Sequence, residues 1–376
     1  MINLKIKSRE ITAPALKHIL GVDQLRYVFA IWVFFAHGGG PPFLAGHVKT
    51  QAFDFLDHLY GWSINGQAAV IGFFIISGLC IHYPNIRRKS LDLKSFYTAR
   101  LLRLSLPLLA CLVIAQLINF HPAKGIVYVV PIWTLYCEFV YYLLYPIVLW
   151  IVKKGVLIHF IVLTCFLSFI LIIIWAGERS MYFHEIGGGG LLYWKAALLA
   201  FPCWLFGVLI AERMSDASRT NKVAQSKQSL WPWRIGAVCL SMITFPLFRV
   251  GLYFKLITRP LTGLIFASQF TLLLFGIYCF YWIEKEVLYN NFGKAIPSKL
   301  LERFGLASYS LYLVHVMVLW ISEQLSPNYF PGYLIFWLAV ILTLHVLVYI
   351  FYVAVEKPSH KLAKFCASYI RGKTNP

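Results

Sequence analysis

Apolar segments of about twenty residues recur along the whole of this 376-residue chain. About twenty apolar residues is the length an α-helix needs to cross a bilayer. Only 13% of the residues are charged, about half the share of a soluble domain, and 60% are hydrophobic. Because lipid offers no partners to backbone polar groups, we predict an all-α, polytopic membrane helix bundle. About ten transmembrane helices are expected, at residues 22–41, 64–83, 98–119, 131–152, 155–176, 191–211, 233–250, 261–283, 304–322 and 332–355.

The polar segments between the spans leave no room for a second domain. The last twenty residues mix apolar with basic side chains, which is typical of a helix lying on a membrane surface. We therefore expect one membrane domain over residues 1–376, made of a cytoplasmic N-terminal segment at 1–21, a transmembrane bundle at 22–355 and a cytoplasmic interfacial tail at 356–376.

The net charge of +19 is distributed unevenly across the inter-span segments. Most lysines and arginines fall on alternate segments, those that share a side with the N-terminus. By the positive-inside rule, this bias predicts cytoplasmic N- and C-termini and an even number of spans. The charge is then explained by topology and by attraction to anionic membrane lipid, so no nucleic-acid partner is expected.

Cysteines and loop histidines indicate neither a disulfide framework nor a metal. Nearly all of the eight cysteines lie in apolar spans and none forms a CxxC pair, so they are expected to be small packing residues. The histidines predicted in outer loops lack a third ligand nearby in the sequence. They are His47, His58, His121 and His184.

The first span contains two ionisable side chains, Arg26 and His37. Such side chains are costly in hydrocarbon and are usually functional there. At about 100° and 1.5 Å per residue, their spacing places both on one helix face, about 16 Å apart along the axis. The sequence therefore predicts a polar path through the bundle. The alternative is a snorkelling arginine and an unrelated structural histidine.

The third span begins with Arg100 and Arg103, which share a helix face and lie at about the depth of Arg26. Three guanidinium groups at one level suit a polyanion, because guanidinium binds phosphate in a planar, bidentate way. Ordinary snorkelling at a helix end is the alternative.

Glu138 is the one acid well inside the fourth span, on a stripe with Tyr142. Its predicted depth matches that of His37, and a carboxylate beside an imidazole orients it as a general base. We therefore predict that these two side chains pair. His315 in the ninth span either lines the same cavity or binds a carbonyl group, and Glu356 at the end of the tenth span neutralises a nearby arginine.

These residues belong to six segments whose order resembles the acyltransferase-3 family of bacterial membrane acyltransferases over nearly the whole chain. Departures occur at Gln24 and Tyr27, where the family usually has glycine, and at Ala99, where it usually has arginine. The matching positions are Arg26 with His37, Phe73 to Gly78, Phe96 to Pro107, Trp133 to Pro146, Ser308 to His315, and Glu356 to Pro358.

The resemblance implies transfer of an acyl group, usually acetyl, from cytoplasmic acyl-CoA to a hydroxyl of an extracytoplasmic or lipid-linked glycan. It implies the bacterial cytoplasmic (inner) membrane, acetyl-CoA as a co-substrate, and no permanently bound cofactor. The implied roles are catalysis for His37 and Glu138, CoA binding for Arg26, Arg100 and Arg103, and support or substrate contact for Ser77, Trp133, Tyr142, Tyr309 and His315. Ser77, Tyr142 and Tyr309 are the candidates to stabilise an oxyanion.

Two other functions use the same buried residues. A secondary transporter or flippase could use the arginines, Glu138 and His37 as a polar track, but no internal repeat is visible. A non-catalytic membrane scaffold would leave the buried charges unexplained.

Overall fold

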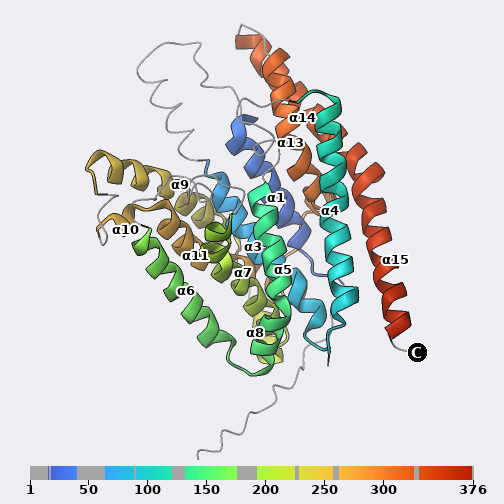
Figure 1. Cartoon of the computed structure of the whole chain (residues 1–376). Helices are drawn as coiled ribbons and strands as arrows, with labels where there is room; N and C mark the ends of the chain where they lie inside the picture. The colour runs from blue at the N-terminus through green and yellow to red at the C-terminus, as the bar shows by residue number, and fades with distance from the viewer. Residues whose placement is uncertain are drawn as a thin grey trace, which may run out of the picture.

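The computed structural model describes most of the chain, and all its regular structure is helical (Figure 1). Predictions on the histidines of the outer loops, and on most of the segment 1–21, lie outside the described residues. The residues described are 16, 18–39, 64–88, 90–120, 132–175, 193–224, 228–256, 262–325 and 330–374.

The described helices follow the predicted spans closely, and several of them continue into short π- or 3₁₀-helical turns, named η. The elements are α1 (Val22–Phe34), η1 (Phe35–Gly39), α3 (Gly66–His82), η2 (Tyr83–Asn85), α4 (Leu93–Leu117), α5 (Ile132–Lys153), α6 (Leu157–Ile174), α7 (Trp194–Met214), α8 (Ala217–Ala224), α9 (Trp231–Tyr253), α10 (Thr262–Phe266), α11 (Ser268–Phe292), α12 (Lys299–Gly305), α13 (Ser308–Leu325), α14 (Phe330–Phe351), η6 (Tyr352–Glu356) and α15 (Lys357–Thr374).

Seven of the described helices are long and apolar enough to cross a membrane, or eight if the bent pair α12 and α13 counts as one span. The described helices thus lie where spans were predicted, and the count of about ten transmembrane helices is not confirmed. Helix α1 has only 13 residues before its geometry changes. Helix α11 carries Glu284, Lys285 and Glu286 near its end, which shortens its apolar part.

Large apolar side chains cover the outside of these helices. Leu163 and Phe166 on α6 and Leu342 and Ile350 on α14 are each more than half exposed. In water such a surface would promote aggregation, whereas in a membrane it is the surface expected to face lipid. Length, composition and surface together describe a multi-pass membrane protein.

Helices α3 and α7 pack closely against each other at two glycines. A Cβ atom on Gly78 would lie 2.0 Å from the Trp204 carbonyl oxygen, and one on Gly207 would lie 1.9 Å from the Ile75 carbonyl oxygen. Only glycine permits this approach of the two backbones, which is how membrane helices gain packing contacts without a hydrophobic driving force.

Two hydrophobic clusters build the interior, and α1 contributes to both. The larger cluster surrounds α3, α7 and α11 and includes Phe29, while the smaller one surrounds α13 and α14 and includes Phe34. Phe73 and Leu104 pack against both clusters. The seam between the clusters is where polar groups gather, as described below.

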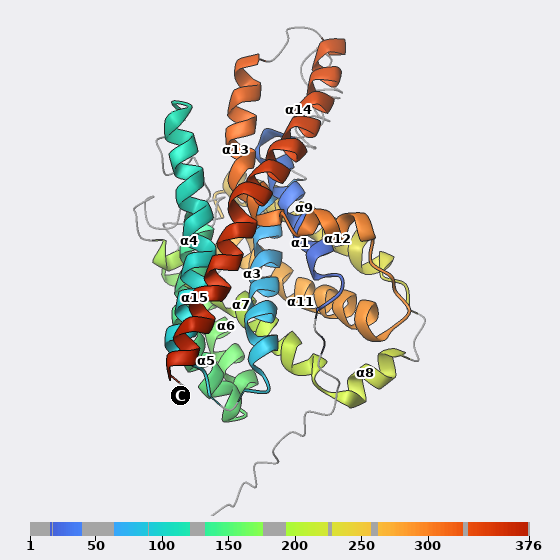
Figure 2. The same cartoon turned by 90° about the vertical axis from the view of Figure 1, so that its right-hand side faces the viewer.

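The C-terminal helix α15 continues from α14 through the π-helical turn η6 and lies alongside α4 (Figures 1 and 2). Ser95 near the start of α4 donates a hydrogen bond of 2.8 Å to the Ala367 carbonyl oxygen. The tail, predicted as an interfacial helix, forms a helix that continues from α14 and packs its buried stripe against α4.

We expect Gly207→Leu to lower the stability of the protein by at least about 1–3 kcal/mol, because the added side chain must push α7 away from α3. Thermal unfolding of the purified protein in detergent measures the effect. Gly372→Leu is the matched control, since a Cβ there meets nothing within 4 Å. Equal unfolding temperatures for the two variants would contradict the glycine-mediated packing.

Candidate active site

A cavity of about 140 Å³ lies at the seam between the two hydrophobic clusters. Six elements supply its polar lining, so no single helix defines it. We call it the inner cavity; its polar lining includes Arg26 of α1, Ser77 of α3, Arg100 and Arg103 of α4, Glu138 and Tyr142 of α5, Tyr309 of α13 and Glu356 of η6. Seven of the ten residues predicted for the site therefore line one cavity.

A second cavity of about 700 Å³, which we call the entrance cavity, adjoins the first. The two share Arg26, Arg100 and Arg103 in their lining. The entrance cavity adds Arg87 and Lys364, so its wall is strongly basic. The three arginines predicted to lie at one level therefore line both cavities.

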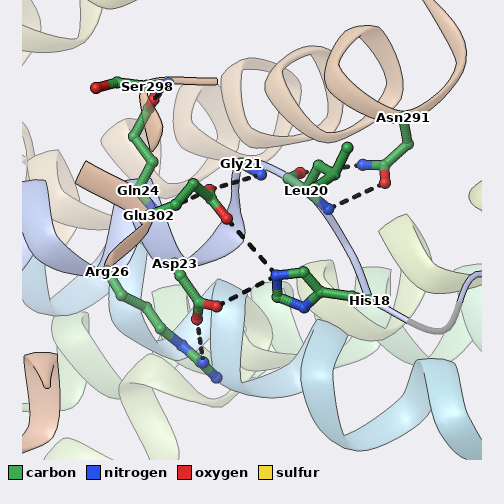
Figure 3. A network of polar contacts seen from close by, with 9 residues as sticks. All are labelled: His18, Leu20, Gly21, Asp23, Gln24, Arg26, Asn291, Ser298 and Glu302. Carbon is green, nitrogen blue, oxygen red and sulfur yellow. Dashed lines mark hydrogen bonds and ion pairs between the residues drawn. The ribbon is translucent and has the colours of Figure 1, made fainter. Parts of the chain in front are cut away.

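Arg26 has a partner that sequence reasoning overlooked. Its guanidinium Nη1 donates a hydrogen bond of 2.9 Å to Oδ1 of Asp23, one turn earlier on α1 (Figure 3). The i, i+3 spacing places the two side chains on one helix face, and an acid in the first turn also suits the helix dipole. The i, i+3 spacing of Asp23 and Arg26 was therefore the sequence feature from which this ion pair could have been predicted.

Arg100 and Arg103 have no carboxylate within ion-pair distance among the described residues. The Arg100 guanidinium lies over the rings of Phe96 and Tyr142, at 5.8 and 5.9 Å from their centroids. Nε of Arg103 donates to Nε2 of His360 at 3.2 Å. Cations that face a cavity without a paired anion create a site for an anionic ligand.

Glu138 lines the inner cavity, but its contacts differ from those predicted. The Ser77 hydroxyl donates to Oε1 of Glu138 at 2.8 Å, and the Tyr142 hydroxyl donates to the same oxygen. The indole of Trp204 in turn donates to Ser77 Oγ at 3.3 Å. Glu138 is therefore held among hydroxyl groups on the arginine side of the bundle, rather than shown in the predicted contact with His37.

His37 instead packs against His315 of α13. Their rings stack with centroids 5.1 Å apart and planes 18° apart, and His37 Nδ1 lies 2.9 Å from His315 Nε2. Nδ1 of His315 lies 2.8 Å from the Tyr312 carbonyl oxygen and 3.2 Å from that of Leu311. Of the two roles predicted for His315, the structure shows the carbonyl contact, while its other nitrogen binds His37.

These contacts determine which nitrogens carry protons. A carbonyl only accepts hydrogen bonds, so Nδ1 of His315 must be the protonated nitrogen, and Nε2 of the neutral ring must accept. The donor to it is then Nδ1 of His37, which leaves Nε2 as the basic nitrogen of the neutral His37 ring. His315, itself held by the Tyr312 carbonyl, thus takes the orienting part that sequence reasoning assigned to Glu138.

The regular α-helical geometry of α1 ends before His37. The sequence-based calculation of where Arg26 and His37 lie on the helix did not include this change. His37 has φ −89° and ψ 15°, and Gly38 has φ 103°, a left-handed conformation that favours glycine. The assumption of one regular helix, with Arg26 and His37 on a shared face, is therefore wrong. The break turns the exposed His37 ring toward α13.

Tyr312 lies between the inner cavity and the histidine pair. Its side chain lines the cavity, its hydroxyl hydrogen-bonds Thr134 Oγ1 at 2.6 Å, and its ring centroid is 5.9 Å from that of His315. Neither His37 nor His315 is among the residues that line the inner cavity. The two polar regions are adjacent, with Tyr312 as the residue common to both.

The predicted oxyanion donors already have acceptors. Ser77 and Tyr142 donate to Glu138, and Tyr309 donates at 2.8 Å to the Leu104 carbonyl oxygen. Trp133 packs edge-on against Phe74, 6.3 Å between centroids, and does not line the inner cavity. The contacts of Ser77, Tyr142 and Tyr309 therefore do not support their assignment to an oxyanion, and Trp133 stays a predicted supporting residue.

Comparison with known protein families indicates that this chain is an enzyme. A family model described as an acyltransferase domain matches residues 19–354, which includes every predicted site residue. The chain belongs to the acyltransferase-3 family. Searches of curated proteins and of solved structures returned no match. The cavities and the histidine pair are therefore features of a membrane acyltransferase.

Glu356 of this acyltransferase is buried and accepts two hydrogen bonds from Ser310. The Ser310 backbone N–H and hydroxyl donate to its Oε2 at 3.0 and 2.5 Å, while His360 Nε2 lies 3.7 Å from Oε1. The sequence suggested that Glu356 neutralises an arginine. Its direct contacts instead join η6 to the start of α13.

We expect Glu356→Ala to destabilise the enzyme by about 1–3 kcal/mol, because two buried donors of Ser310 lose their acceptor. Glu356→Gln keeps an acceptor oxygen and is expected to lose less. Thermal unfolding in detergent compares both with Glu323→Ala, which changes an exposed acid on α13. If Glu356→Ala unfolds at the same temperature as that control, the contact is not a structural one.

Proposed function

We propose that this acyltransferase moves an acyl group, acetyl in the simplest case, from acyl-CoA to a hydroxyl of a glycan or lipid-linked saccharide at the bacterial cytoplasmic membrane. The observation that carries the proposal is the convergence of Arg26, Arg100 and Arg103 on connected cavities. The last two have no carboxylate partner within ion-pair distance among the described residues.

The chemistry of CoA matches this arrangement. CoA carries several phosphate groups at one end and a thioester on a long, flexible arm at the other. Guanidinium groups bind phosphate oxygens with two parallel hydrogen bonds, and the entrance cavity of about 700 Å³ is within the ~300–1,000 Å³ usual for ligand sites. The phosphates would lie at the entrance, and the arm would extend through the inner cavity.

The lining of the entrance cavity supports a cytoplasmic donor. His18, Arg87, Ser215 and Lys364 all contribute to it. Each belongs to a segment that the positive-inside rule assigns to the cytoplasm. Acyl-CoA is made and kept in the cytoplasm, so an entrance on that side would admit it directly.

The histidine pair supplies a general base on the other side of Tyr312. Nε2 of His37 would take the proton of the acceptor hydroxyl as its oxygen attacks the thioester carbonyl carbon. The tetrahedral intermediate would then collapse, breaking the C–S bond, and the leaving CoA thiolate would take the proton from the His37 imidazolium. His315, held by the Tyr312 carbonyl, positions the base and stabilises its charged form.

We expect Arg100→Ala and Arg103→Ala each to raise the dissociation constant for CoA by roughly 10- to 100-fold. The reason is that a charged hydrogen bond contributes about 1.5–3 kcal/mol and about 1.4 kcal/mol is tenfold. Titration calorimetry with CoA and the purified protein measures this.

Arg249→Ala is the matched control for these variants, because Arg249 is an exposed arginine on α9 that lines neither cavity. Arg100→Lys should bind with intermediate affinity, since it keeps the charge and loses the bidentate geometry. Unchanged CoA binding in both alanine variants would contradict the assignment of acyl-CoA as the donor held by these arginines.

We expect His37→Ala to lower acyl transfer by about 10²- to 10⁴-fold, the usual contribution of a general base. His315→Ala should lose less and should change the pH profile of the rate. His315→Gln, whose amide oxygen can accept from His37 Nδ1, should recover part of the loss.

Mass spectrometry of surface and lipid-linked glycans measures the products. Cells with the gene deleted, restored, or restored with each variant are compared, which identifies the acceptor and the acyl group at once. Wild-type acylation by a membrane-inserted His37→Ala protein would refute the base assignment. Loss of acylation in His37→Ala with normal CoA binding is the expected pattern.

A further inference from the structure

Three potential metal ligands meet beside the entrance cavity, at the start of α1. They are His18 in the segment before α1, Asp23 in its first turn and Glu302 in α12 (Figure 3). One ligand atom from each lies within 4.8 Å of the other two. Residues 18 and 302 are far apart in sequence, which is why a search for ligand spacing indicated no metal.

The distances in this cluster are longer than good hydrogen bonds; they fit ion pairs, and they also fit ligands that share one cation. His18 Nε2 lies 3.5 Å from Asp23 Oδ2 and 3.6 Å from Glu302 Oε2. A good N–H···O bond spans about 2.7–3.2 Å. By contrast, two ligands on a tetrahedral Zn²⁺, each bonded at about 2.0–2.2 Å, lie about 3.3–3.5 Å apart.

Each carboxylate also has its other oxygen held by the protein. Asp23 Oδ1 accepts from Arg26 at 2.9 Å, and Glu302 Oε1 accepts from the backbone N–H groups of Gly21 and Gln24 at 2.9 and 3.1 Å. Supporting hydrogen bonds of this kind orient the ligands in metal sites. They leave Oδ2 and Oε2 directed at His18, as Figure 3 shows.

The backbone around the cluster is rigidly packed. Helices α1 and α12 approach so closely that a Cβ on Gly305 would lie 1.8 Å from the Asp23 carbonyl oxygen. Asp23 and Glu302 are therefore placed before any ligand arrives. The His18 side chain is 56% exposed, so it can move by the few tenths of an ångström that coordination requires.

Charge also favours a cation at this position. Two carboxylates face one arginine and a histidine, which leaves negative charge beside a cavity whose other walls are basic. Three protein ligands with one open position is the arrangement of catalytic zinc sites. His18 and Asp23 both line the entrance cavity, so the open position would face it.

We propose that His18, Asp23 and Glu302 bind a divalent transition-metal cation of the Zn²⁺ class, with its fourth position open to the entrance cavity. Water or an anionic oxygen completes the coordination. That the anionic oxygen is a phosphate of acyl-CoA rests on the proposed function, whereas binding of the cation does not.

The experiment measures Zn²⁺ alone, without acyl-CoA. Purified full-length protein in detergent is stripped with a chelator, dialysed against buffered Zn²⁺ and analysed for bound metal, and its affinity is measured by calorimetry. His18→Cys keeps a zinc ligand, while His18→Lys keeps a positive partner for the carboxylates and cannot serve as a neutral imidazole ligand. His159→Ala, which removes an exposed histidine on α6, is the matched control.

The wild type, His18→Cys and His159→Ala are each expected to hold one more zinc ion per chain than His18→Lys. The affinity of the site in His18→Lys should fall by at least about 100-fold, the upper end of the loss caused by removing a supporting group. Equal zinc content in the wild type and His18→Lys would overturn the proposal. So would a wild type that binds no zinc.

Thermal unfolding of the same samples shows that the variants are folded. Zn²⁺ should raise the unfolding temperature of the wild type and of His18→Cys and leave that of His18→Lys unchanged, because only binding to the folded state stabilises it. A zinc-dependent rise in His18→Lys equal to that of the wild type would also overturn the proposal. CoA binding is measured separately, so failure of the metal site and failure of the proposed function remain distinguishable.

Discussion

Accommodating half-buried guanidinium groups inside an apolar helix bundle is the physical constraint on which the rest of this structure depends. Such groups cannot give up their charge, so each needs a partner, a cavity or a ligand. Arg26 has Asp23, while Arg100 and Arg103 rely on aromatic faces, on His360 and on the cavities they line. Two hydrophobic clusters separated by a polar seam are the fold's solution to this problem.

The seam separates two kinds of chemistry. On one side, cations face an entrance lined by basic residues, and on the other, two stacked imidazoles are oriented by a backbone carbonyl. Tyr312 joins them, since its side chain lines the cavity and its carbonyl holds His315. In the proposed reaction, this separation would keep a donor held by its phosphates apart from the base that acts on the acceptor hydroxyl.

The contacts of Glu138 show that equal depth in the membrane does not imply contact between two side chains. Counting residues from the span ends placed it level with His37, and depth alone was taken to imply contact. The structure gives Glu138 two hydroxyl donors, Ser77 and Tyr142, and the Trp204 indole of α7 donates in turn to Ser77. Two helices at one depth can present their polar faces in different directions, and the facing direction depends on how the helices pack around each other.

Local sequence determined a large part of this protein. Apolar length marked the helices, buried charge marked Arg26, Arg100, Arg103 and Glu138 as cavity residues, and six ordered segments indicated the family that the domain match confirms. Tertiary structure alone decided which side chains meet: His37 with His315, Glu138 with Ser77, and His18 with Glu302. The physical reason is that hydropathy and charge act on each segment separately, whereas these pairings depend on the break in α1 at His37 and on glycine-mediated helix packing.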